Sequence, residues 1–172
     1  EDTAGFGAGA IVFLYTAAGR HVDPPRQFTQ CLAWSADNGM TLTKYEGNPV
    51  LPAVHHDFRD PKVFWHEPTG RWAMVISAGR EVLFFTSTNL TKWDYASNFS
   101  GGHQMSIWEV PDLFPLTIDG ETKWVLLVSV GDYSPAGGNG IQYFIGDFDG
   151  ERFSVEDSEQ ILWMDYGSDN YA

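Results

Sequence analysis

The feature of this chain that most constrains its fold is a repeated pair of β-rich runs, each pair followed by a polar turn and a short aromatic strand. Equivalent positions recur after 52 residues from Ser35 to Ser87, and after 60 residues from Ser87 to Asp147. A period of this size, with about four strands in each unit, is typical of β-propeller blades. The three pairs are Ala10–Thr16 with Gln30–Ser35, Arg71–Ser77 with Glu81–Ser87, and Lys123–Ser129 with Ile141–Phe148.

The fold class predicted from this repeat is all-β. Helical periodicity is nearly absent, and Gly, Asp, Asn and Pro interrupt the runs at short intervals. A β-sandwich would also give short strands, but not so regular a repeat. About three four-stranded antiparallel blades fit into 172 residues, whereas propellers typically have four or more. We therefore expect an internal segment of a larger propeller, and a chain that opens at Glu1 without an initiator Met is consistent with this.

Composition excludes several classes of function. The formal net charge of −13 argues against nucleic acid, and equally against an anionic membrane surface, as a partner. A single cysteine, Cys31, rules out an intrachain disulfide framework and a Cys-rich metal site. No apolar run approaches the length of a membrane span. No metal is expected, because only His55 and His56 lie close together and that pair is expected in a solvated loop.

Two short acidic motifs stand at the first-strand positions of neighbouring blades. Asp60 lies in Phe58–Pro61, and Glu109 lies 49 residues later, which is close to one repeat. The innermost strand of each blade lines the central channel, so both carboxylates are expected at one end of it. Cleavage of a glycosidic bond requires two such converging carboxylates. An Asp before Pro also commonly caps a turn, so either motif alone would indicate little.

The sequence strings are similar to those of glycoside hydrolase family 32, the five-bladed β-propeller fructosidases that include invertases, exo-inulinases and levanases. The resemblance spans nearly the whole chain, with several independent motifs in the same order. These motifs are Gln30–Ser35 with Asp37–Gly39, Lys44–Leu51, Phe58–Val63, Trp108–Phe114 and Tyr166–Ala172.

The resemblance implies a role for each acidic residue. Asp60 matches the family's transition-state stabiliser, and Glu109 matches the general acid/base, which would protonate the leaving oxygen and then activate water. That role requires a carboxyl group whose proton affinity the site can raise. Substrate contacts are implied for five residues, with burial as the alternative for the aromatic members: Arg59, Trp108, His103, Asp169 and Tyr171.

Two departures from the family pattern matter. The family usually has Cys after the acid/base Glu, where this chain has Val110. The family's nucleophile lies in a Trp-Met-Asn-Asp-Pro-Asn-type motif that is absent here, since the only Asn-Pro is Asn48-Pro49. Residues 1–172 are thus expected to be a segment of a single β-propeller catalytic domain. The first blade with the nucleophile, the last blades and the C-terminal β-sandwich would lie outside it, and the segment alone should be inactive.

The implied activity is retaining hydrolysis that releases terminal fructose from sucrose, inulin or levan, with a fructose-containing saccharide as partner and no cofactor. Fructosyl transfer by the same site and a non-catalytic carbohydrate-binding propeller stay open as alternatives, and a related family acting on arabinose or xylose is less favoured. Secretion is expected, and the sequons at Asn89 and Asn98 add weak support. Substrate preference would depend on rim loops such as Asp132–Gly140.

Overall fold

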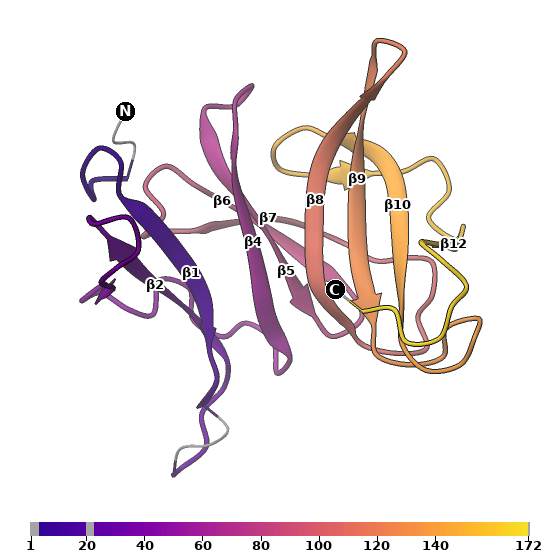
Figure 1. Cartoon of the computed structure of the whole chain (residues 1–172), viewed down its shortest axis with the longest axis horizontal. Coiled ribbons are helices and arrows are strands. Elements are labelled where there is room, and N and C mark those ends of the chain that lie inside the picture. The colour runs from indigo at the N-terminus through magenta and orange to yellow at the C-terminus, as the bar shows by residue number, and fades with distance from the viewer. Residues whose placement is uncertain (1–3, 20–22, 172) are drawn as a thin grey trace.

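The computed structural model describes residues 4–19 and 23–171 and contains three antiparallel sheets that follow one another in chain order (Figure 1). The first sheet has three strands within the described residues, in the order β1-β2-β3. Ala172, at the end of the last family-like motif, lies outside the described residues. The strands of the first sheet are β1 (Ile11–Ala17), β2 (Thr29–Ser35) and β3 (Thr43–Lys44).

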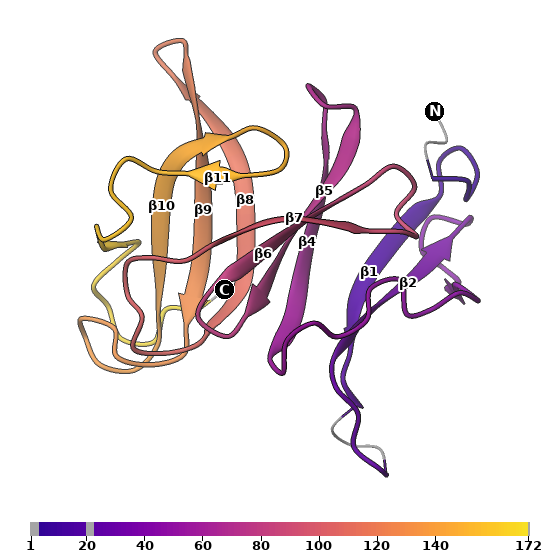
Figure 2. The same cartoon turned by 180° about the vertical axis from the view of Figure 1, so that it is seen from behind.

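The second and third sheets repeat the same up-and-down order. The second sheet comprises β4 (Phe58–His66), β5 (Arg71–Ala78), β6 (Val82–Ser87) and β7 (Asp94–Phe99). The third comprises β8 (Trp108–Ile118), β9 (Glu121–Val130), β10 (Gly140–Phe148) and β11 (Phe153–Ser154), and β12 (Leu162–Trp163) also pairs with β10. The predicted all-β repeat is confirmed, and the short strand β12 is an addition to it. In the view from behind, β7 and β11 lie in front of their neighbouring strands (Figure 2).

The core lies between successive sheets, and β5 shows why. Successive strand residues point to opposite faces of a sheet. Ala73 and Val75 therefore face the third sheet, whereas Met74 and Ile76 belong to a cluster toward the first sheet that includes Leu51. A strand buried on both faces reads as a continuous apolar run rather than an alternating one.

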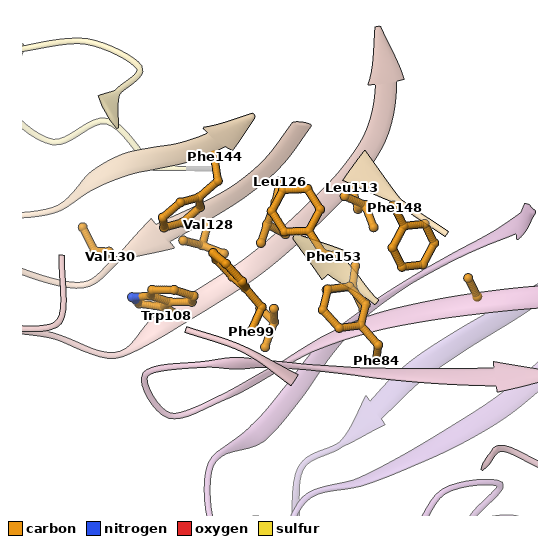
Figure 3. Close-up of a cluster of buried hydrophobic side chains, with 13 residues drawn as sticks. Phe84, Phe99, Trp108, Leu113, Leu126, Val128, Val130, Phe144, Phe148 and Phe153 are labelled. Atoms are coloured by element: carbon orange, nitrogen blue, oxygen red, sulfur yellow. The ribbon is translucent and has the colours of Figure 1, made fainter. Parts of the chain in front are cut away.

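Aromatic side chains fill the space between the second and third sheets (Figure 3). Phe84 of β6 packs against Phe148 of β10 with ring centroids 5.6 Å apart, and Phe99 of β7 packs against Phe153 at 5.2 Å. Burying each such side chain stabilises the fold by about 1.5–3 kcal/mol. At this interface β4 lies next to β8, and these are the two strands that carry the acidic motifs. The described residues contain no helix that could cross a membrane.

Candidate active site

The two acidic motifs lie on matching β-bulges. On β4 the pairing with β5 passes from Arg59↔Ser77 to Lys62↔Val75, so β4 holds one extra residue. On β8 the pairing with β9 likewise passes from Glu109 to Asp112 with one extra residue. A bulge bends its strand and re-aims side chains, and is common next to active sites.

The register of the two bulges corrects the expectation that the carboxylates occupy equivalent positions. Glu109 is equivalent to Arg59, and Val110 is equivalent to Asp60. Asp60 and Val110 both have a positive φ, of 62° and 43°. Asp60 thus lies one position later in its bulge than Glu109 does in the other bulge. This offset sets Glu109 against the guanidinium of Arg59, and the backbone of Val110 against Asp60.

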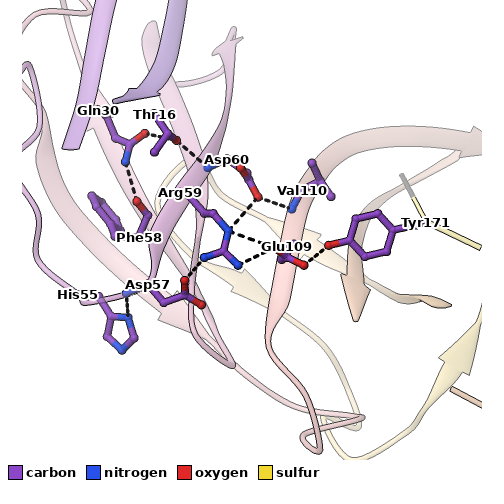
Figure 4. Close-up of polar contacts among 10 residues, drawn as sticks. All are labelled: Thr16, Gln30, His55, Asp57, Phe58, Arg59, Asp60, Glu109, Val110 and Tyr171. Atoms are coloured by element: carbon purple, nitrogen blue, oxygen red, sulfur yellow. Dashed lines mark hydrogen bonds and ion pairs between the residues drawn. The ribbon is translucent and has the colours of Figure 1, made fainter. Parts of the chain in front are cut away.

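Arg59 joins the acidic groups of the site (Figure 4). Its Nε and a terminal nitrogen donate to Glu109 Oε1 at 3.1 and 2.5 Å, and its other terminal nitrogen pairs with Asp57. Its Nε also lies 3.8 Å from Asp60 Oδ2. Charge-assisted bonds of this kind are about twice as strong as neutral ones. The guanidinium therefore holds three carboxylates together that would otherwise repel one another.

Tyr171 occupies the other oxygen of Glu109, because its hydroxyl donates to Glu109 Oε2. Burial raises the pKa of Glu109, but the hydrogen bonds from Tyr171 and Arg59 and the positive charge of Arg59 outweigh it, so the pKa lies below its usual value. Partial burial and the Glu109 carboxylate raise the pKa of Tyr171 above its ordinary value. Glu109 is consequently ionised at neutral pH, which suits a base. Acting as an acid requires that Arg59 and Tyr171 release it.

Asp60 is held from both sides. Its Oδ2 accepts the Val110 N–H at 3.1 Å, and its own N–H donates to Thr16 Oγ1 at 3.0 Å. Its side chain is 28 % exposed and that of Glu109 is 23 % exposed. Both carboxylates are therefore fixed in place yet reachable by a ligand.

Trp108 and His103 lie in the interior rather than on a wall of this cluster. Trp108 has no exposed surface, packs against Phe144 at 5.7 Å and donates its indole N–H to the His103 carbonyl. His103 is 9 % exposed, and its ring packs edge-on against Trp163 at 5.1 Å. Both residues are therefore buried, which was the alternative to a substrate contact.

Asp169 lies against the Gly-rich loop. A Cβ placed on Gly138 would fall 2.7 Å from Asp169 Oδ1, which is too close for any residue other than Gly without a shift. Among the described residues, Asp169 is not hydrogen-bonded to Asp60 or Glu109. Of the seven residues predicted for the site, the structure thus brings together Arg59, Asp60, Glu109 and Tyr171.

Three residues of the arrangement escaped the sequence analysis. Asp57 binds the guanidinium of Arg59, and Thr16 and Gln30 contact the backbone around it. Asp57 lies two residues before Arg59, so its place beside the motif could have indicated that it belongs to the site. Nothing in the sequence indicated the contact of Thr16, because Thr16 lies 44 residues from Asp60 in the chain. Within residues 4–19 and 23–171, no three His, Cys, Asp or Glu side chains form a metal-binding group.

The chain is similar to known proteins over its whole length. The family model described as the glycosyl hydrolases family 32 N-terminal domain matches residues 3–172. A levanase of Bacillus subtilis (strain 168) is 47 % identical over the whole chain, which covers 26 % of that protein. An extracellular exo-inulinase of Meyerozyma guilliermondii is 47 % identical over 84 % of the chain, which covers 29 % of that protein.

Solved structures agree as well. A fructofuranosidase from Schwanniomyces occidentalis complexed with fructose matches with a TM-score of 0.89 and 39 % identity, over 99 % of this chain and 34 % of that one. The exo-inulinase of Aspergillus awamori matches with a TM-score of 0.86 and 32 % identity, over 99 % of this chain and 39 % of that one.

The three consecutive antiparallel sheets have the β-propeller fold of the matched fructofuranosidase and exo-inulinase structures. The chain belongs to glycoside hydrolase family 32. It spans about a quarter to two fifths of the length of the relatives it matches.

Proposed function

We propose that this chain is part of the catalytic propeller of a retaining exo-acting β-fructosidase, which releases terminal fructose from sucrose, inulin or levan. The single observation that supports this most is the pair of carboxylates, Asp60 and Glu109, on matching bulges of adjacent sheets. The relatives named levanase, exo-inulinase and invertase support the same activity.

Each residue of the cluster has a distinct part in the proposed reaction. Glu109 protonates the glycosidic oxygen and then activates the water that releases fructose. Asp60 accepts hydrogen bonds from fructosyl hydroxyls as positive charge develops on the sugar ring. Arg59 holds both carboxylates and contacts the sugar. The nucleophile comes from a part of the propeller outside these 172 residues.

The proposed substrates follow the names of the relatives. The related fructofuranosidase of Schwanniomyces occidentalis was solved with fructose and with fructosyl-erythritol, and a variant of it with fructosylnystose. A neutral saccharide also suits a chain with a net charge of −13, because it is not repelled. Related exo-inulinases are named extracellular, and we propose the same location for this protein.

The test is product analysis with the full-length protein that contains this chain. Incubation with levan, inulin and sucrose should release free fructose as the first product, with no intermediate oligosaccharides from the two polymers. Oligofructosides that dominate at high sucrose concentration would favour transfer instead. Binding of the saccharides without any release would indicate a non-catalytic propeller.

A further inference from the structure

The backbone on either side of Arg59 is held by two side chains of the neighbouring sheet. Gln30, on β2, has no exposed surface and donates its Nε2 to the Phe58 carbonyl at 2.9 Å. Thr16, on β1, donates its hydroxyl to Gln30 Oε1 at 2.9 Å and accepts the Asp60 N–H at 3.0 Å. We call this chain of hydrogen bonds the Thr16–Gln30 clamp (Figure 4).

The direction of every bond in the clamp is fixed by chemistry. A backbone N–H only donates, so the Thr16 oxygen accepts from Asp60 and uses its own proton for Gln30. A backbone carbonyl only accepts, so the amide nitrogen of Gln30 must face Phe58 and its oxygen must face Thr16. Loss of the Thr16 hydroxyl would therefore remove the partner of two groups, the part-buried Asp60 N–H and the oxygen of the buried Gln30 side chain.

The position of the clamp follows from the sheet register. Thr16 and Gln30 are direct partners in the β1–β2 ladder, so their side chains stand next to each other on one face. The bulge on β4 takes Asp60 out of its own ladder with β5, and its N–H needs a partner elsewhere. Thr16, in the first sheet, supplies that partner. The bond thereby helps to hold Asp60 at a φ of 62°, which is otherwise unfavourable.

We propose that Thr16 and Gln30 are positioning residues for Asp60, which set the place of its carboxylate relative to Glu109 without touching substrate. The clamp fixes the Asp60 backbone from the first sheet, and the Val110 N–H fixes its carboxylate from the third. The stabiliser is thus aligned by both neighbouring sheets. This inference rests on the proposed function only for its effect on catalysis.

The test compares Thr16→Val and Thr16→Ser in the full-length protein. Thr16→Val keeps the branched shape and removes the hydroxyl, whereas Thr16→Ser retains the hydroxyl. In Thr16→Val we expect amide hydrogen exchange at Asp60 to be about 3- to 10-fold faster, as loss of one hydrogen bond implies. We expect kcat to fall about 10-fold with little change in KM, since small displacements of an aligned group slow catalysis. Thr16→Ser should restore both.

Two further variants separate positioning from general stability. Thr86→Val alters a buried threonine of β6 outside the site and should leave kcat and Asp60 exchange unchanged. In an Asp60→Asn background, adding Thr16→Val should not lower kcat further, because the group through which Thr16 acts is already lost.

Each outcome decides a separate point. Unchanged Asp60 exchange in Thr16→Val would overturn the clamp itself. Faster exchange with an unchanged kcat would overturn its positioning role. A wild-type protein that releases no fructose would overturn the proposed function, while the exchange comparison would still decide whether the clamp holds Asp60.

Discussion

The backbone N–H of Val110 donates to the Oδ2 of Asp60 at 3.1 Å, which links the two acidic motifs across adjacent sheets. The link exists because the two bulges are equivalent and place Val110 opposite Asp60. The residue that follows the proposed acid/base therefore orients the proposed stabiliser. Movement of either bulge would therefore change the positions of both carboxylates.

Replacing Asp60 with Asn should lower kcat for fructose release by about 10²–10³-fold, since removing one transition-state-stabilising group typically has this effect. The Asn oxygen can still accept the Val110 N–H, so the bulge should stay intact. Steady-state kinetics and thermal unfolding of the full-length protein measure the two effects. A variant with near-normal kcat would show that Asp60 is not the stabiliser.

Tyr171→Phe should shift the pH dependence of catalysis. The Tyr171 hydroxyl is one of the groups that lower the pKa of Glu109, so its removal raises that pKa. A general acid must be protonated, and the alkaline limb of the kcat/KM profile should therefore move to higher pH. A limb that stays in place, or moves to lower pH, would contradict the contact.

The same contact affects stability with a definite sign. Because the pKa of Glu109 is lowered in the folded protein, its stabilising effect is present above the usual Glu pKa and is lost as the pH falls through the folded value. Tyr171→Phe should reduce this acid-dependent loss, which denaturant unfolding across the acidic range measures.

Much of the fold could be predicted from the sequence, because the blade repeat is visible as recurring β-rich runs. The residue-level geometry of the site could not. Asp60 and Glu109 are separated by nearly one repeat, yet the bulges set them one position apart. A bulge is defined by the pairing of two strands, so it cannot be read from the sequence of one strand alone. The Thr16 contact depends in the same way on how two sheets pack.

Trp108→Phe tests the interior position of this residue. The change removes part of a side chain that has no exposed surface and its bond to the His103 carbonyl. We expect the free energy of unfolding to fall by about 1–3 kcal/mol, with KM unchanged. Tyr166→Phe, at a residue that is 73 % exposed, is the control and should have little effect. A large rise in KM with unchanged stability would instead restore Trp108 to the wall of the site.

Val110→Cys tests backbone strain at the bulge. A β-branched residue is unfavourable at a φ of 43°, and Cys lacks the second branch. We expect the free energy of unfolding to rise by up to about 1 kcal/mol. The kcat should stay within about twofold, because the N–H to Asp60 is retained. Urea unfolding measures the difference, and a less stable variant would show that the packing of the Val110 methyl groups outweighs the strain.

The most direct test of the central claim is the rate of fructose release from levan by the full-length protein with Glu109→Gln. Gln keeps the size of the side chain but can neither donate nor accept the catalytic proton. We predict that kcat falls by about 10²–10⁴-fold while the midpoint of thermal unfolding stays close to that of the wild type. Fructose release at a near-normal rate by a folded Glu109→Gln variant would contradict the assignment of Glu109 as the acid/base.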